Sequence, residues 1–226
     1  MFDITGKFQK AVHLDDCVYG HGLKNLGNNE FSVTDMDGHK IYVLDSEFQE
    51  KMRFDCHNRP KFQGAFNHPT DCDRSKDGRF YISDGYGNSV VHIFSNQGKH
   101  ITTFGEPGRA SGQFSTPHSI VIDQQQRVCV ADRENNRIQR FTLDGKFIDE
   151  IIDVYKPMAL ATLPNGTLLC TDQTPKLSAF SLDGSLIGRC RTFGTFAHGI
   201  DIAPNGTIVI AEMMPNRLSF LLPLES

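Results

Sequence analysis

The sequence predicts an all-β fold of the β-propeller type, and three observations lead to it. One sequence pattern, a series of short strands, recurs five times within the 226 residues. Turns rich in Gly, Asn and Asp separate these strands, and no segment shows the apolar spacing of a helix. Each copy contains one strand that ends in an acid, and these acids follow one another at intervals of 49, 48, 40 and 40 residues. Such intervals suit a blade of four short strands.

The copies can be followed in order along the chain. The strands that end in an acid are Phe31–Asp35, Phe80–Asp84, Val128–Asp132, Leu168–Asp172 and Ile208–Glu212. A polar turn and a further strand follow each of them, namely Lys40–Leu44, Val90–Phe94, Arg137–Phe141, Lys176–Phe180 and Arg217–Leu221. A Gly-containing turn and a fourth strand close most copies. With no linker between copies, residues 1–226 are predicted to form one propeller domain.

The two ends of the chain allow two ways of closing the ring. Residues 2–12 read as the third strand, turn and fourth strand of another copy, whereas the last copy stops after its third strand. The N-terminal strand would then complete the last blade of a five-bladed ring and remove its open edge. Alternatively, the propeller has six blades, with five full repeats and an incomplete first blade in this chain.

Composition and charge exclude several classes of function. The formal net charge is -4, and the basic balance or stripe of a general nucleic-acid binder is absent. No apolar run approaches the roughly 20 residues that cross a bilayer. Because the six cysteines are scattered and the first residues lack a signal-peptide pattern, we expect a reducing, cytoplasmic compartment. The sequence sets no oligomeric state.

Three histidines occupy one register of the repeat. The residues that stand fourteen positions before the terminal acids are His21, Thr70, His118, Met158 and His198. This register opens the innermost strand of each blade and faces the channel, and alternate blades of a six-bladed ring lie about 120° apart. A tripod of neutral imidazoles with an open fourth position is the ligand set of a catalytic zinc ion. Each histidine alone would read as a core residue, but their recurrence in alternate copies favours a metal site.

Two further side chains are expected at the same mouth of the channel. The second strand of each blade runs back toward it, so the turns after Asp84 and Asp132 bring Tyr86 and Arg133 to the histidine face. A phenol can act as a general base and an arginine can hold a carboxylate. Ordinary turn chemistry is the alternative for both.

Longer motifs carry a resemblance to a known family. The repeats resemble NHL repeats, and the chain is similar to the lyase domain of the peptidylglycine α-amidating monooxygenases and their bacterial relatives. The motifs are Tyr81–Ser89, Gly112–Phe114, Thr116–Ser119 and Val130–Gln139. The resemblance implies a six-bladed propeller that cleaves peptidyl-α-hydroxyglycine into a peptide amide and glyoxylate. It also places His21, His118 and His198 on zinc ligands, Tyr86 on the catalytic tyrosine, and the carbonyl of Leu23 on a calcium ligand.

The chain departs from this family at several positions. The catalytic arginine of the family's first blade has no counterpart here, and Arg133 is assigned to the substrate carboxylate by its position alone. Gly199 stands where animal enzymes carry a calcium-binding Asp, and Phe196 replaces a methionine near the active site. Gly87 and Arg140 stand where two disulfide cysteines would be.

The sequence therefore predicts a carbon–nitrogen lyase that takes a peptide or a small α-hydroxyglycine-type substrate, with zinc and a doubtful calcium as cofactors. One rival is a non-catalytic NHL-repeat propeller that binds a protein or peptide. A lactonase-type hydrolase is a weaker rival, because its calcium would require carboxylate and Asn ligands. A second zinc site at Cys56, His57, His68 and Cys72 has irregular spacing and is disfavoured. Neither a nucleic acid nor a membrane is expected as a partner.

Overall fold

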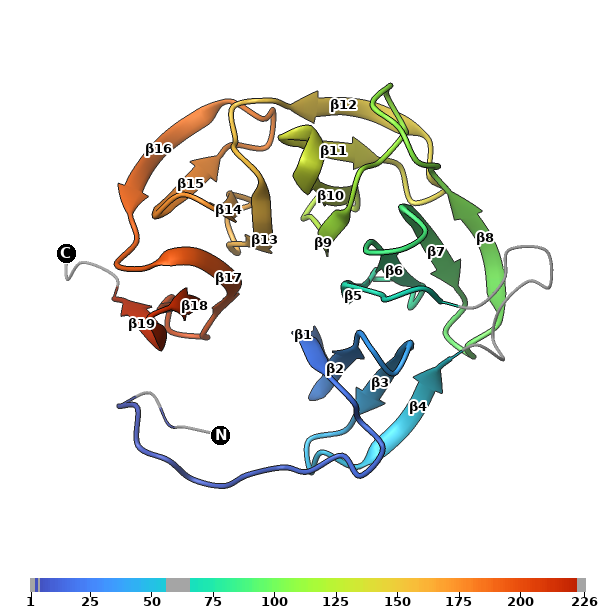
Figure 1. Cartoon of the computed structure of the whole chain (residues 1–226), viewed down its shortest axis with the longest axis vertical. Coiled ribbons are helices and arrows are strands. Elements are labelled where there is room, and N and C mark those ends of the chain that lie inside the picture. Colours follow the sequence, from blue (N-terminus) through green and yellow to red (C-terminus); the bar gives the residue numbers. More distant parts are fainter. Residues whose placement is uncertain (1–2, 4, 56–65, 223–226) are drawn as a thin grey trace.

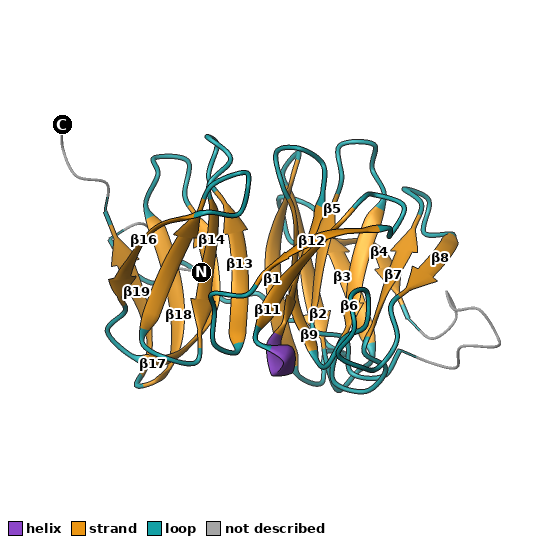
Figure 2. Ribbon diagram, turned by 90° about the horizontal axis from the view of Figure 1, so that it is seen from above, coloured by secondary structure: helices purple, strands orange, loops and turns teal. Residues whose placement is uncertain are grey.

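The computed structural model describes residues 3, 5–55 and 66–222 of the chain. These residues form 19 strands in five antiparallel sheets, together with one 3-10 turn, η2 (Arg133–Asn135). The sheets stand side by side around a central axis (Figure 1), and η2 lies on one face of the resulting disc (Figure 2). None of the described residues forms a helix with the length and apolar character needed to cross a membrane. The predicted β-propeller is confirmed.

Four of the sheets have four strands and the fifth has three. The first two sheets contain β1 (Gly20–Gly27), β2 (Glu30–Asp35), β3 (Lys40–Leu44), β4 (Glu50–Phe54), β5 (Asp71–Arg74), β6 (Phe80–Asp84), β7 (Val90–Phe94) and β8 (His100–Phe104). The third and fourth sheets contain β9 (Pro117–Ile122), β10 (Val128–Asp132), β11 (Arg137–Phe141), β12 (Phe147–Ile151), β13 (Pro157–Thr162), β14 (Leu168–Asp172), β15 (Lys176–Phe180) and β16 (Leu186–Arg191). The fifth sheet contains β17 (Thr195–Ile202), β18 (Ile208–Met214) and β19 (Asn216–Leu221).

Each sheet is a meander whose first strand lies nearest the axis (Figure 1). Hairpins join consecutive strands, and the turns place residues such as Gly166 (φ +88°) and Gly206 (φ +85°) in the left-handed region that glycine tolerates. The innermost strand of the third sheet, β9, is buried along its whole length, whereas the outer strand β16 is mostly exposed. This burial gradient is what the sequence pattern of apolar inner strands and polar outer strands dictates.

The core consists of four apolar layers, one between each pair of neighbouring sheets. The layer between the second and third sheets shows the chemistry, since Tyr81 and Ile93 on one side meet Ile120 and Val130 on the other, with Phe141 completing the contact. All five side chains are buried. Because the second, third and fourth sheets are covered on both faces, their inner strands are held rigidly enough to position side chains in the channel.

The ring remains open between the fifth and first sheets, and the N-terminal segment runs across that gap (Figure 1). The interpretation of residues 2–12 as two strands of a blade is wrong for the described part, because residues 5–12 form no strand and their β-pairing is an isolated bridge at Phe8. Instead, Asp3 accepts hydrogen bonds from the backbone N–H groups of Thr5 and Lys7 and fixes a local turn. Among the described residues, this segment adds no fourth strand to β17–β19.

Candidate metal centre

The three histidines lie at the same local irregularity of the sheet. In β9 the residues on either side of His118 pair with Asp132 and Ala131 of β10, so His118 is an extra residue in the ladder, a β-bulge. The same bulge occurs at His21 opposite Asp35 and at His198 opposite Glu212. A bulge re-aims its side chain without ending the strand. Here it directs each imidazole into the channel.

The imidazoles converge on one point of the axis. Their ring centroids are 4.9 Å apart for His21 and His118, 4.7 Å for His21 and His198, and 4.8 Å for His118 and His198. One nitrogen of each ring lies within 4.8 Å of the corresponding nitrogens of the other two. His118 is buried, and the other two are half-buried. In the described part of the chain no other group of three His, Cys, Asp or Glu side chains is arranged to hold a metal.

Main-chain carbonyls from neighbouring sheets orient two of the rings. His21 Nδ1 donates to the carbonyl of Thr70 at 2.8 Å, and His118 Nδ1 donates to the carbonyl of Met158 at 2.7 Å. Thr70 and Met158 are the residues that occupy the histidine register in the second and fourth copies. Because a carbonyl only accepts, each Nδ1 carries the proton and each Nε2 keeps its lone pair. The two copies without histidine thus fix the tautomers of His21 and His118.

The surroundings keep all three imidazoles neutral. Burial is the main cause and lowers the pKa of His21, lowers that of His198 to about 4, and holds that of His118 well below its usual value. The other imidazoles and the positive charge of Arg133 act in the same direction on His118 and His198. Neutral imidazole is the form that binds a metal.

Tyr86 lies directly against the tripod. Its hydroxyl group is 3.1 Å from His21 Nε2 and 2.9 Å from His118 Nε2. Gly85 makes this approach possible, because a Cβ atom there would lie 2.1 Å from the carbonyl oxygen of Pro117. Burial raises the pKa of the Tyr86 phenol, while Arg133 opposes that shift. The Asp-Gly-Tyr turn therefore combines a close contact between sheets with a reactive side chain.

Arg133 completes this end of the channel. Its Nη1 donates to the Tyr86 hydroxyl at 3.3 Å, and its guanidinium carbon lies 5.2 Å from the centre of the Tyr86 ring. Its Nε donates to Glu134 at 3.0 Å, which holds the side chain from behind. The structure thus brings together the three histidines, Tyr86 and Arg133, the five side chains that the sequence analysis singled out.

The donor set fits a metal ion. Two unprotonated Nε2 atoms face one phenol, which has a single proton to give, so at least one lone pair has no hydrogen donor. His198 adds a third imidazole to the same point. Three nitrogen ligands with space for a fourth are the arrangement that zinc takes in catalytic sites.

Other residues considered from the sequence do not join this group. Phe196 lies two residues from His198 and has a positive φ of 57°, while Gly199 brings no ligand atom from its side chain. Cys56 and His57 lie outside the described residues. Cys72 is buried with its thiol directed at the carbonyl of Asp73. The five described cysteines are all free thiols.

Sequence reasoning missed two charged residues of the channel, Lys24 and Asp71. Lys24 lies three residues after His21 and lines the same channel space, a cavity of about 50 Å³. Burial lowers its pKa, but Asp71, Asp73 and Asp201 outweigh burial and raise it. A lysine in an inner strand reads as a solvated residue in a single sequence, so no pattern pointed to it.

In at least three copies the terminal acid fixes the backbone that leads into the innermost strand. Asp132 accepts a hydrogen bond from the backbone N–H of Ser115 at 2.7 Å, three residues before His118. Asp84 does the same for the N–H of Asn67 at 3.0 Å, and Glu212 for that of Gly194 at 2.7 Å. The recurring acid is therefore a buried clamp that positions the channel-facing residue.

Comparison with known proteins gives relatives of two kinds. A protein family described as a 6-bladed beta-propeller matches residues 65–174. A probable peptidyl-alpha-hydroxyglycine alpha-amidating lyase of Caenorhabditis elegans is 29% identical over 224 residues, which cover 88% of this chain and 62% of that protein. A peptidylglycine alpha-amidating monooxygenase of Rattus norvegicus is 38% identical over 141 residues, or 58% of this chain and 14% of that protein.

The second kind comprises propellers in which the likeness is more general. NHL repeat-containing protein 3 of Homo sapiens is 28% identical over 179 residues, or 71% of this chain and 51% of that protein. Among solved structures, a streptogramin B lyase superimposes with a TM-score of 0.67 at 17% identity, covering 94% of this chain and 72% of that one. That likeness shows the fold alone. The chain spans less than two thirds of the length of each of the three sequence relatives.

Proposed function

We propose that this chain, which resembles the peptidyl-α-hydroxyglycine α-amidating lyases, is a lyase of that type. It would cleave the C–N bond of a peptidyl-α-hydroxyglycine and yield a peptide amide and glyoxylate. The observation that carries the proposal is the convergence of three neutral imidazoles from alternate sheets on the hydroxyl group of Tyr86. A general propeller scaffold has no need of this arrangement.

The reaction is a transfer of one proton coupled to the breaking of one bond. The hydroxyl group on the α-carbon loses its proton and becomes the carbonyl of glyoxylate. The electron pair of the C–N bond passes to the amide nitrogen, which gains a proton. Atoms and charge balance without water or an external oxidant. The protein therefore has to hold the substrate, accept a proton at oxygen and return one at nitrogen.

His21, His118 and His198 would hold the metal, with zinc as the ion that best suits three imidazoles. When bound, such an ion supplies positive charge that acidifies hydroxyl groups beside it. Tyr86 is the group in reach to accept the substrate's hydroxyl proton, since its oxygen already lies at the tripod. The guanidinium of Arg133 favours the phenolate form of Tyr86 and offers a partner for the carboxylate that leaves with glyoxylate.

The direct test is glyoxylate release from a peptide that ends in α-hydroxyglycine. Zinc-loaded protein is compared with the His118→Ala variant, and the His100→Gln variant serves as a matched control, because His100 contacts Thr103 away from the channel. We expect release by the wild-type protein and by His100→Gln, and loss of at least 100-fold in His118→Ala. Equal rates in wild-type and His118→Ala would contradict a role for the tripod.

A second candidate is a non-catalytic NHL-repeat propeller that binds a protein or peptide. The similarity to NHL repeat-containing protein 3 favours it, and the repeats by themselves do not separate the two functions. Folded, zinc-loaded protein that releases no glyoxylate from several α-hydroxyglycine peptides would decide for this alternative.

A further inference from the structure

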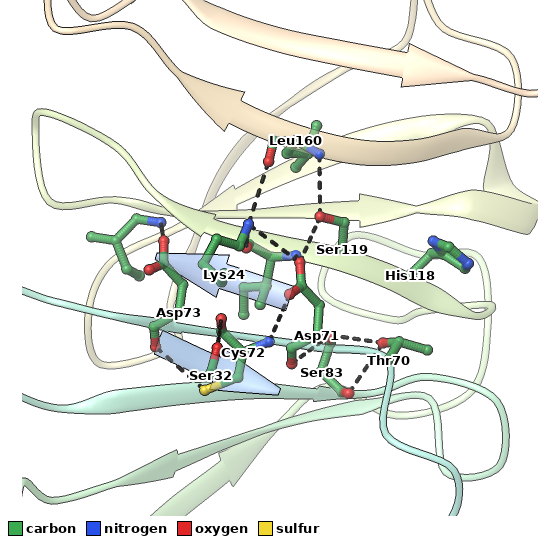
Figure 3. A network of polar contacts seen from close by, with 12 residues as sticks. Lys24, Ser32, Thr70, Asp71, Cys72, Asp73, Ser83, His118, Ser119 and Leu160 are labelled. Carbon is green, nitrogen blue, oxygen red and sulfur yellow. Dashed lines mark hydrogen bonds and ion pairs between the residues drawn. The ribbon is translucent and has the colours of Figure 1, made fainter. Parts of the chain in front are cut away.

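Further along the channel from the histidines lies a fixed positive charge, the ammonium group of Lys24. We call this part of the channel its inner level. Lys24 extends from β1 into the channel, and its side chain is only 13% exposed. The ammonium nitrogen lies 3.1 Å from the carbonyl oxygen of Ile120, 3.4 Å from that of Leu160, and 3.4 Å from Asp71 Oδ2 (Figure 3). An ammonium group has three hydrogens to donate. All three therefore have an oxygen partner, each from a different sheet.

The carboxylate that faces Lys24 is itself fully engaged. Asp71 Oδ2 accepts hydrogen bonds from Ser119 Oγ at 2.8 Å and from the backbone N–H of Ile120 at 3.1 Å. Ser119 Oγ in turn accepts from the N–H of Leu160 at 3.2 Å. Figure 3 shows this network beside His118. It joins the innermost strands of four sheets, and Lys24 is its cation.

The oxygens that hold Lys24 share a register with the backbone position to which the family resemblance assigns calcium. Leu23, Ile120 and Leu160 each stand twelve residues before the terminal acid of their copy. In the structure each pairs with the residue two positions before that acid, which confirms that they are equivalent. Carbonyl and carboxylate oxygens are the ligands that calcium takes. This level of the channel is therefore chemically a cation site.

The residues present do not fit a calcium ion at this level. Two of the carbonyls and the one contacting carboxylate already bind the Lys24 ammonium. Gly199, at the position of the family's calcium-binding Asp, offers no carboxylate. A divalent ion beside a fixed ammonium group would also experience direct repulsion.

We propose that Lys24 is a tethered cation that replaces a dissociable metal ion at the inner level of the channel. Its ammonium group neutralises Asp71 and binds the channel carbonyls, so the first four sheets are held together at the axis without calcium. The corollary is that removal of the ammonium group leaves an oxygen-lined site able to take a divalent cation. This inference concerns the inner level alone and does not depend on lyase activity.

The test measures thermal unfolding and calcium binding in the full zinc-loaded chain. We expect calcium chloride at millimolar concentration to leave the melting temperature of the wild-type protein unchanged. The Lys24→Ala variant should melt at a lower temperature and recover at least half of the loss when calcium is added. Calorimetric titration should show calcium binding at least tenfold tighter in Lys24→Ala than in the wild-type protein.

Two further variants distinguish the loss of the ammonium charge from a general loss of folding. Lys24→Met fills the space with an apolar chain, and it should show a smaller calcium response than Lys24→Ala. The pair Lys24→Ala with Asp71→Asn removes both charges, and it should be more stable than Lys24→Ala alone and insensitive to calcium. Tight calcium binding by the wild-type protein would overturn the proposal. So would a double variant that responds to calcium as strongly as Lys24→Ala.

Discussion

Two imidazoles of the tripod each depend on one backbone atom that no side-chain pattern reveals. His21 and His118 are oriented by the carbonyls of Thr70 and Met158, which occupy the same register in the next sheet. No described carbonyl accepts a hydrogen bond from His198 in this way. His198 belongs to β17, whose sheet lies beside the open gap of the ring, where no described sheet follows (Figure 1). The tripod thus consists of two well-oriented ligands and one that is held less firmly.

The neutrality of the tripod predicts a dependence of stability on pH in the metal-free protein. The pKa of His198 is lowered to about 4, whereas an unfolded histidine titrates near 6.5. Between these values the unfolded chain binds more protons, so stability is complete above pH 6.5 and falls as the pH drops toward 4. His198 alone should cost about 2 kcal/mol of unfolding free energy between pH 7 and pH 5.

Urea unfolding of chelator-treated protein at a series of pH values checks this expectation. The His198→Gln variant serves as the control, because it lacks the titrating group and should show a shallower slope between pH 7 and pH 5. If both proteins lose the same stability over that range, His198 is not buried in its neutral form.

The hydroxyl group of Tyr86 is the part of this side chain that would act as the general base. Replacing Tyr86 with Phe removes the hydroxyl group and keeps the ring that packs against Arg133. Loss of a general base should lower kcat by about 100-fold to 10,000-fold, with a much smaller change in KM. Zinc content, measured in parallel, should stay at one ion per chain. A Tyr86→Phe variant with kcat within threefold of wild type would remove Tyr86 from the mechanism.

At the scale of the strand, the repeat pattern predicts the positions of channel-facing residues, which strand propensities alone do not. The register of three histidines could be read because the terminal acids align the copies. In the second, third and fifth copies this acid binds the backbone that leads into the inner strand. The bulges that turn the histidines inward could not be read, since an extra residue in a ladder leaves no mark in a single sequence. The hydrogen-bond network of Lys24 could not be predicted from the sequence for a related reason. Its partners are mostly main-chain atoms, which every sequence offers.

The N-terminal segment shows where local pattern fails. Alternation of apolar and polar residues measures the readiness of a segment to be a strand, but a strand forms only where a partner edge lies beside it. The described residues before β1 belong to none of the five sheets, and Phe8 forms only an isolated β-bridge. Propensity therefore predicted the strands inside the repeats correctly and mispredicted the segment outside them.

The clamp predicts an effect of substitution at Asp132. This carboxylate is buried and accepts hydrogen bonds from Ser115, Asn135, Arg137 and Gln139. Replacing it with Ala leaves the buried guanidinium of Arg137 with only Glu150 as an acidic partner. The unfolding free energy should fall by about 3 kcal/mol or more. Metal affinity should also fall, because the Ser115 N–H no longer fixes the approach to His118.

Chemical denaturation together with zinc titration measures both effects. The exposed acid Asp144, which pairs with Arg79 at the surface, supplies the matched control. Asp144→Ala should change stability by less than about 1 kcal/mol and leave zinc affinity unaltered. Equal losses in the two variants would mean that the terminal acid is an ordinary surface charge.

At the scale of the whole molecule, the three histidines of the proposed metal site come from the first, third and fifth sheets. The first and fifth sheets flank the open gap of the ring (Figure 1), yet His21 and His198 have ring centroids only 4.7 Å apart at the axis. A metal on the tripod would therefore join the two free ends of the arc. The inner network of Lys24, Asp71, Ser119 and Leu160 spans the first to the fourth sheet and does not reach the fifth. On these proposals, a metal on the tripod would join the first, third and fifth sheets, and the Lys24 ammonium group joins the first four.

This division of roles predicts where zinc stabilises the chain. Binding to the folded state alone adds about 2.7 kcal/mol at a free zinc concentration 100 times the Kd. In a chain of this size that gain should raise the Tm by about 5–10 °C. Hydrogen exchange should slow most in β17–β19 and β1, because these strands lack a neighbour across the gap. The His118→Ala variant should lose the rise in Tm, whereas His100→Gln should keep it. Protection confined to the third sheet would mean that zinc binds without His21 and His198, and the two ends of the arc would then have to be held together by packing alone.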